Sequence, residues 1–425
     1  MTLCFHSLIH RPKIKRWLKI LALLEEKEQT TVAYLSELAQ CSKRTIHKDL
    51  KEIKQYFKNE VMITGDDHGI HFAFRAPNEY TKKVQALIED EPLLLLLARF
   101  FDDRPASNQE LAAMLGVSLA TFNRLKRDCS ILLNTNYGLR IDAHSNTLLG
   151  SERAIRQAMF DFFCTLPLYP KQLESTVAPF RSKTTTISSS RWNLDHALIN
   201  QWAAIVKIRT EQGHVLPEHR TAGELQTVLA REWEKETKIH FPEREQAALF
   251  VLCLSETSFY DPLYQKEFLH YFLPLIPRRF MAEIEEPELA QLFRLVIFLL
   301  TQFVGLPQAV LKEARKRKIV PEEYLFDHFM HRYIQVVEEV KKTVFLTYDL
   351  TGSQAIKRWI KQEVAAYFKA KGWTICPTSQ ATIHSSIRHL TITNRVSTNS
   401  NTSVIHLSSV PSTNEVGDIL AKLEK

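Results

Sequence analysis

Residues 110–118, with the sequence ELAAMLGVS, decide the fold of the N-terminal part of this chain. The alanines stand where two helices must approach closely, Gly116 stands at a turn where a positive φ costs glycine little, and Ser118 is placed to cap a second helix. Residues 138–149, after that second helix, are hairpin-like. The stretch therefore predicts a helix-turn-helix motif.

An offset of 76 residues reveals an earlier copy of the motif, because it places Gln40-Cys41-Ser42 over Gly116-Val117-Ser118. Apolar residues at helical spacing predict a first helix over residues 13–27, and Thr30-Thr31 offer a cap to a second helix over 32–39. Ser42 is the expected cap of a third helix, which has an apolar stripe of Ile46, Leu50, Ile53 and Phe57. Residues 61–74 read as a two-stranded hairpin, so this copy is predicted to be a winged helix-turn-helix.

The polar face of the last helix in each copy is the predicted DNA contact. Arg and Lys side chains there can reach guanine acceptors or phosphates in a major groove. The second copy has Leu119-Ala120 where the first has Lys43-Arg44, so we expect it to contact phosphates rather than bases. The candidate DNA-binding residues are Ser42, Lys43, Arg44, Thr45, His47 and Lys48 in the first copy, and Asn123, Arg124, Lys126 and Arg127 in the second.

Charge supports a polyanionic partner. The 425-residue chain has a formal net charge of +7. Residues 1–60 contain 12 Lys and Arg against 7 Asp and Glu, so this short part of the chain carries a surplus of +5. A cationic N-terminal part is typical of a nucleic-acid-binding protein.

The remainder is predicted to be helical from about residue 152 to 340 and mixed after that. Two apolar runs, 93–98 and 295–300, are too short for a membrane span and are expected to be buried helices. After residue 342 the pattern changes to alternating strands and helices of the kind that form a parallel sheet. The expected helices of the middle part cover 192–208, 225–233, 243–258, 289–303 and 322–340. The C-terminal part is expected to hold strands over 343–347, 373–376, 390–393 and 404–407, and helices over 353–371 and 414–422.

Several functions lack a sequence signal. The six cysteines form no C-x-x-C pair, so neither a disulfide framework nor a metal site is indicated. The N-terminus lacks the apolar core of a signal peptide, which favours a cytoplasmic protein. No P-loop, G-x-S-x-G, H-E-x-x-H or G-x-G-x-x-G motif occurs, so we expect no enzyme activity and no cofactor.

The order of these parts resembles the Mga/AtxA family of virulence regulators, over nearly the whole chain. Residues 37–50 and 110–127 carry the resemblance in the DNA-binding part, and residues 341–353 carry it at the C-terminal part. The resemblance implies a mainly α, multidomain fold in which two helical PTS regulation domains are phosphorylated on histidine by the phosphocarrier protein of the sugar phosphotransferase system. It also implies a homodimer formed through a C-terminal domain similar to enzyme IIB. The expected domains are a winged helix-turn-helix (1–76), an Mga-like helix-turn-helix (77–151), a first PTS regulation domain (152–262), a shortened second one (263–340) and the IIB-like α/β domain (341–425).

Two histidines are candidates for phosphorylation. His196 follows Asn193-Leu194-Asp195 in the first regulatory region, and His328 lies in the segment YLFDHF, residues 324–329, in the second. A phosphoryl group would add negative charge to a helix surface. His270 and His331 are lesser candidates. The loop after the first C-terminal strand, where IIB enzymes carry a reactive Cys, contains Tyr348-Asp349-Leu350-Thr351-Gly352-Ser353 and no sulfur nucleophile.

The sequence therefore predicts a cytoplasmic, dimeric transcriptional activator that binds promoter DNA and responds to the phosphotransferase system. A phosphotransfer component of the IIB type is an alternative, which the missing Cys disfavours. An RNA-binding antiterminator is another, but proteins of that kind begin with a small β-rich domain. A scaffold that has lost DNA binding is the third alternative.

Overall fold

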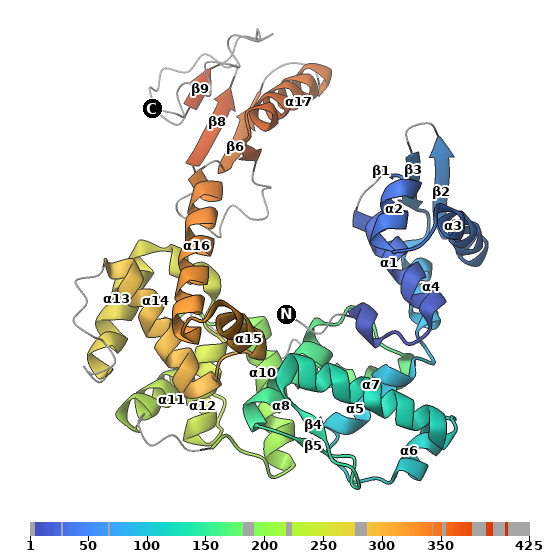
Figure 1. The fold of residues 1–425 in the computed structure, drawn as a ribbon. Helices are drawn as coiled ribbons and strands as arrows, with labels where there is room; N and C mark the ends of the chain where they lie inside the picture. The colour runs from blue at the N-terminus through green and yellow to red at the C-terminus, as the bar shows by residue number, and fades with distance from the viewer. Residues whose placement is uncertain are drawn as a thin grey trace. The chain divides into compact units, whose positions relative to one another are not determined.

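The computed structural model is mainly α-helical and multidomain (Figure 1). Two compact units are formed, one by residues 1–254 with 298–321 and the other by residues 255–297 with 322–425. The structure describes residues 5–26, 29–66, 69–181, 191–217, 223–276, 287–341, 343–350, 354–375, 388–393 and 404–406. The predicted helix over 414–422, Cys376 and the segment Thr351-Gly352-Ser353 lie outside these residues.

The first winged helix-turn-helix packs three helices on a three-stranded antiparallel sheet. Thr31 caps α2, since its hydroxyl accepts the N–H of Tyr34, and Ser42 caps α3 in the same way. The hairpin predicted over residues 61–74 is confirmed, and a two-residue strand, β1, adds to it in the order β1-β3-β2. The elements are η1 (Phe5–Leu8), α1 (Pro12–Glu26), β1 (Gln29–Thr30), α2 (Val32–Leu38), α3 (Lys43–Phe57), β2 (Val61–Asp66) and β3 (Gly69–Phe74).

Two helices connect the first motif to the second. The run 93–98 lies in α5, where its residues are buried except for Leu95, which is partly exposed, as expected for a core helix. In the second motif, Ser107 and Glu110 form a reciprocal capping box at the start of α6. The elements are α4 (Pro77–Leu87), α5 (Pro92–Phe101), α6 (Asn108–Met114), α7 (Leu119–Tyr137), and the short antiparallel pair β4 (Arg140–Ile141) and β5 (Leu148–Leu149).

The helical remainder of this unit departs from the sequence prediction at two helix ends. The helix expected over 192–208 begins only at His196, because Asp195 caps it and Leu194 pairs with Leu254 in an isolated β-bridge. The helix expected over 243–258 ends at Leu252 for the same reason. The elements are α8 (Glu152–Phe160), the π-helix η2 (Asp161–Thr165), η3 (Lys171–Leu173), α9 (Glu174–Arg181), α10 (His196–Glu211), α11 (Gly223–Thr237), α12 (Glu243–Leu252), the π-helix η7 (Leu300–Val304) and α15 (Gln308–Arg317).

The other unit contains helices and a small parallel sheet. The strands run in the order β7-β6-β8-β9, all parallel, which confirms the parallel sheet expected at the C-terminal part. Ile360, Val364 and Phe368 of α17 pack with apolar residues of β6 and β8 to form its core. The elements are η4 (Glu256–Tyr260), α13 (Pro262–Phe272), η5 (Leu273–Leu275), α14 (Glu288–Leu299, whose last turn joins the first unit), α16 (Pro321–Lys341), β6 (Thr343–Asp349), α17 (Gln354–Ala370), β7 (Thr374–Ile375), β8 (Arg388–Thr393) and β9 (Val404–His406).

Candidate nucleic-acid interface

The turn between α2 and α3 sets the direction of the first recognition helix. Gln40 adopts a left-handed conformation with φ of 52°, and the N–H of Cys41 donates to the carbonyl of Ser36. The hydroxyl of Ser42 accepts the N–H of Thr45 at 3.2 Å and lies 2.9 Å from the Thr45 hydroxyl. Ser42, a predicted DNA-binding residue, is thus engaged as the helix cap.

A buried carboxylate holds the back of α3 against α1. Asp49 is 2% exposed and accepts hydrogen bonds from the guanidinium group of Arg16 and from the indole N–H of Trp17, the latter at 3.1 Å. The hydrogen bond that Arg16 donates to Asp49 raises the pKa of Arg16 above its ordinary value. This arrangement fixes the rotation of α3 about its axis, so that the opposite face is turned to solvent.

The solvent face of α3 carries the cationic side chains predicted to bind DNA. Lys43, Arg44, His47 and Lys48 are exposed, and Thr45 is partly exposed. Lys48 has an acidic neighbour, Glu52, at 4.0 Å. The four exposed side chains come from the first two turns of one helix, and they form one polar surface.

The wing extends this surface on the side of α3 that faces β2 and β3. A hollow of about 540 Å³ lies between α3 and the hairpin, and His47, Lys51 and Lys54 line it together with Gly65 and Asp66. Lys51 and Lys54 are exposed and were not among the predicted contacts. The 76-residue offset contains the signal that identifies Lys51, since it places this lysine over Arg127.

The second motif repeats the first turn closely. Gly116 has φ of 64°, and the N–H of Val117 donates to the carbonyl of Ala112, as Cys41 does to Ser36. The hydroxyl of Ser118 accepts the N–H of Thr121 at 3.2 Å and lies 3.0 Å from its hydroxyl. The predicted repeat is therefore present in the backbone as well as in the sequence.

The exposed face of α7 is less cationic than that of α3. Asn123, Arg124 and Arg127 are exposed, whereas Leu119 and Ala120 occupy the first turn. The ammonium group of Lys126 instead donates to the carbonyls of Asp142 and Ala143 in the second wing, both at 3.2 Å, and burial lowers its pKa. Of the four predicted residues in this copy, the structure thus brings three to the surface and one to the wing.

Comparison with protein families gives two matches, and together they cover both motifs. Residues 16–69 match the family described as an HTH domain, and residues 80–163 match the family described as the Mga helix-turn-helix domain. The second copy lies within the region that matches the Mga helix-turn-helix family, residues 80–163, which is called the Mga domain below. The resemblance to Mga regulators is confirmed over the two tandem motifs, and the matches support a DNA-binding transcriptional regulator. No curated protein matched the chain.

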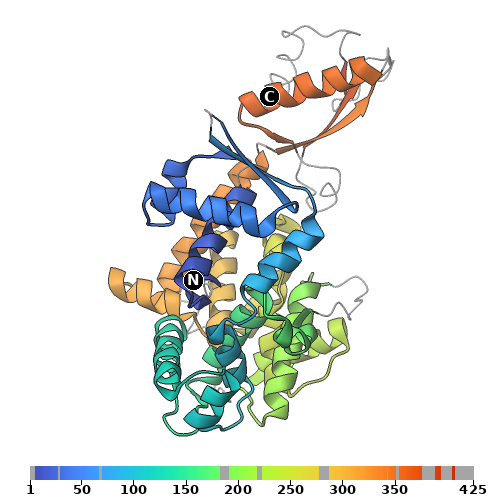
Figure 2. The same cartoon turned by 90° about the vertical axis from the view of Figure 1, so that its right-hand side faces the viewer.

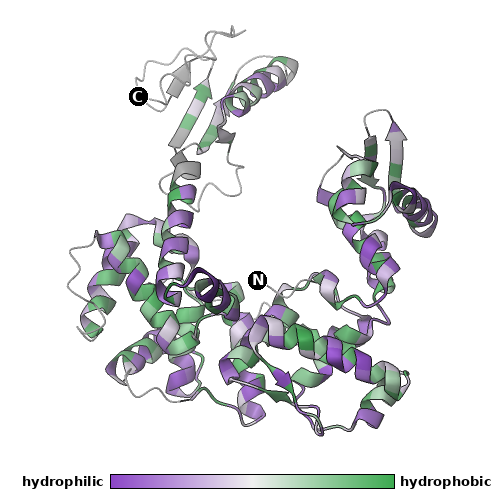
Figure 3. Ribbon diagram, viewed as in Figure 1, coloured by the Kyte–Doolittle hydropathy of each residue, from purple (hydrophilic) through white to green (hydrophobic). Residues whose placement is uncertain are grey.

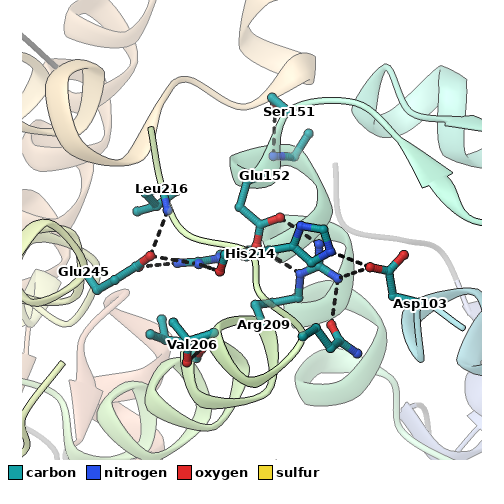
Figure 4. Close-up of polar contacts among 12 residues, drawn as sticks. Asp103, Ser151, Glu152, Val206, Arg209, His214, Leu216 and Glu245 are labelled. Atoms are coloured by element: carbon teal, nitrogen blue, oxygen red, sulfur yellow. Dashed lines mark hydrogen bonds and ion pairs between the residues drawn. The ribbon is translucent and has the colours of Figure 1, made fainter. Parts of the chain in front are cut away.

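A buried network of charges connects the Mga domain to the helices that follow it (Figure 4). Arg209 of α10 donates two hydrogen bonds to Glu152 of α8, at 2.9 and 2.7 Å, and contacts Asp103 in the α5–α6 connection at 3.5 Å. Arg156 of α8 donates both to Glu152 and to Glu245 of α12. Burial opposes ionisation of Glu152, but the bonds from the two arginines lower its pKa below the ordinary value. The network also includes His214, which contacts Asp103, and the N–H of Leu216, which donates to Glu245.

The two predicted phosphorylation sites lie on exposed helix surfaces. His196 is the first residue of α10, and the side chain of Asp195 accepts the N–H groups of Ala197 and Leu198 beside it. His328 is exposed on α16. Within the described ranges, no three His, Cys, Asp or Glu side chains converge as a metal site would require. Among the same residues, no helix combines the length and apolar character needed to cross a membrane.

Proposed function

We propose that this chain is a cytoplasmic transcriptional activator that reads promoter DNA with α3 and strengthens the contact with α7. The observation that carries the proposal is the exposed cationic face of α3, whose orientation is fixed from behind by the Asp49–Arg16 pair. Arg44 and Lys48 have the reach for base edges or phosphates at the N-terminal end of a recognition helix. No catalytic step is part of this proposal.

A double substitution, Arg44→Ala with Lys48→Ala, tests the reading helix. Both side chains are exposed, so we expect the fold to persist while duplex affinity falls and the slope of log affinity against log salt drops by about 2. The matched control is Lys207→Ala with Lys266→Ala, which removes the same charge from exposed positions on α10 and α13. Unchanged affinity of the first variant at moderate salt would show that α3 is not the reader. Genome-wide mapping of bound DNA, compared with transcripts after deletion, tests the regulatory role itself.

The proposed signal is phosphorylation of His196 and His328 by the phosphocarrier protein of the sugar phosphotransferase system. Both side chains are accessible, and a phosphoryl group brings roughly 1.5 to 2 negative charges at neutral pH. His196→Asp and His328→Asp should change promoter output, whereas alanine at the same positions should not reproduce the aspartate effect. His240→Asp is the control, because His240 is also exposed. Absence of phosphoryl transfer to either histidine in vitro, with all four variants behaving as wild type, would contradict this part.

Self-association through the C-terminal domain completes the proposal. Ile356 and Trp359 expose apolar surface on α17, with Trp359 38% exposed. A regulator with two reading helices gains affinity when a second copy engages adjacent duplex. Trp359→Glu, or removal of residues 342–425, should shift the protein toward monomer in analytical ultracentrifugation. An undiminished dimer in both would place the interface elsewhere. The five domain boundaries, from 1–76 to 341–425, stay part of the proposal.

A further inference from the structure

Helix α15 carries a dense cluster of cations that the reading helices do not include. The sequence of residues 311–320 is LKEARKRKIV, with five Lys and Arg against one Glu. The five cationic residues are all exposed, and Figure 3 shows the helix as strongly hydrophilic. These residues, the α15 cluster, are Lys312, Arg315, Lys316, Arg317 and Lys318.

Contacts with the Mga domain place this helix beside the recognition helix α7. The ammonium group of Lys312 donates to the carbonyl of Thr135, and the side chain of Gln308 lies against Gly138 at the end of α7. Figures 1 and 2 both show α15 next to the C-terminal end of α7. The η7 helix just before α15 is held in place as well, since Arg153 and Arg244 donate to the carbonyl of Gln302 at 3.0 and 2.8 Å.

The cluster continues a row of exposed side chains that begins at the predicted DNA contacts. Four exposed side chains of α7 recur at a spacing of three or four residues and therefore share one face of the helix: Arg124, Arg127, Ile131 and Thr135. The backbone carbonyl of Thr135 is the one that accepts the bond from Lys312. Lys312, Arg315 and Lys316 share a face of α15 by the same spacing. From Arg124 to Thr135 the row spans roughly 16 Å along the helix axis, which is about five phosphate steps of one DNA strand.

Helix stability alone does not account for the cluster. Cations in the last turn of a helix offset the negative end of its dipole. One or two charges provide that effect, whereas further like charges one turn apart repel one another. Within the described part of the chain, no carboxylate lies within ion-pair distance of Arg315, Lys316 or Lys318. Among the described residues, the repulsion between these cations is therefore left uncompensated.

We infer that α15 binds the phosphate backbone of duplex DNA beside the site contacted by α7, through Arg315 and Lys316. The inference rests on the proposed DNA-binding function and extends the contact of the Mga domain beyond its helix-turn-helix. Contacts of this kind position the protein and add affinity without reading sequence. They also give the weaker recognition helix a second source of phosphate contacts.

The test is Arg315→Gln with Lys316→Gln, which keeps two good helix formers and removes two charges. The probe is a mixed-sequence duplex of about 40 base pairs, roughly four helical turns. We expect duplex affinity to fall about tenfold and the salt slope to fall by about 2, equally for every sequence tested. The control is Lys207→Gln with Lys266→Gln, which should leave both quantities close to wild type, and circular dichroism checks that each variant is folded.

Two results overturn the inference while leaving the proposed function intact. One is an unchanged affinity and slope in the α15 variant when the wild type binds the duplex, which would assign the cluster to another polyanion. The other is an equal loss in the control pair, which would show an effect of net charge alone. A wild-type protein that binds no duplex at all would instead remove the proposed function.

Discussion

The two recognition helices, α3 and α7, share a scaffold and differ in what they present to solvent. At an offset of 76 residues their caps, Ser42 and Ser118, accept the same hydrogen bond at the same distance. The second turns keep their cations, with Lys48 and Lys51 matched by Arg124 and Arg127. The differences therefore have to be sought at the first turn and at the back of each helix.

At two of those positions, a charged residue in one copy corresponds to an apolar residue in the other. Asp49, a buried carboxylate, corresponds to Leu125, which is fully buried in an apolar core. Leu50 corresponds to Lys126, whose ammonium group is bonded to the second wing. The first helix is thus held from behind by an ion pair, and the second by apolar packing and a lysine to its wing. The two motifs thus share the geometry of the turn and cap but differ in how the recognition helix is held and in what it presents to solvent.

The largest expected effect comes from replacing the ion pair behind α3 by the apolar packing found behind α7. Asp49→Leu leaves the Arg16 guanidinium beside an apolar side chain, and losing one member of a largely buried pair costs about 3 kcal/mol. Chemical denaturation should report this loss of stability. Arg16→Met combined with Asp49→Leu should recover most of it, since replacing both partners by apolar groups is often neutral. Failure of the double variant to recover would mean that the ion pair is not the attachment.

Exchanging the first-turn residues of α3 and α7 should exchange their DNA-binding properties. Lys43→Leu with Arg44→Ala gives α3 the first turn of α7, and a bidentate base contact contributes about 1 to 3 kcal/mol of discrimination. We expect promoter affinity to fall by at least tenfold and to approach that for unrelated duplex in gel-shift titrations. The reverse exchange, Leu119→Lys with Ala120→Arg, should raise affinity for duplex of any sequence. Preserved selectivity in the first variant would move the reading function away from this turn.

The second turn of α7 separates a DNA contact from a structural one. Arg124→Gln should lower the salt slope by about 1, because its exposed guanidinium is free to neutralise a phosphate. The sequence places Lys126 among the DNA contacts, but its ammonium group is occupied by wing carbonyls. We therefore expect Lys126→Leu to leave the slope unchanged and to cost about 1 kcal/mol of stability. A lower salt slope for Lys126→Leu would show instead that Lys126 contacts DNA.

The smallest effect concerns the turn that both motifs share. Gln40 and Gly116 hold equivalent left-handed conformations, which glycine adopts without steric cost. Gln40→Gly should stabilise the first motif by up to about 1 kcal/mol, and Gly116→Ala should destabilise the second by a similar amount. Thermal melts of the two single variants should move in opposite directions. Shifts of the same sign would show that the two turns are not equivalent in energy.

The sequence predicted most of the local structure of both motifs. Periodicity and cap residues identified α3 and the hairpin, and the glycine at position 116 identified the second turn. Local patterns did not show the bridge between Leu194 and Leu254, which ends two helices, because partners 60 residues apart leave no periodic signal. The two residues of β1 were too few to alternate.

The candidate site was predicted less completely than the fold. Exposure of Lys43, Arg44 and His47 followed from the apolar stripe opposite them. The burial of Asp49 did not, since a charged residue in a basic helix is ordinarily placed on its surface. The contact of Lys126 with the second wing was not predicted either, because only the three-dimensional position of the wing shows where a long side chain ends. Comparing the two copies position by position would have exposed both exchanges.

The charge network around Arg156 and Arg209 has a mechanical consequence for gene control. Separating its buried ions costs several kilocalories per mole, so the network resists movement of α8, α10 and α12 past one another. Just before α1, the half-exposed Arg11 pairs with the buried carboxylate of Glu91 at the start of α5. Under the proposed phosphorylation of His196, the added charge would therefore lie on a helix that this network fastens to the Mga domain.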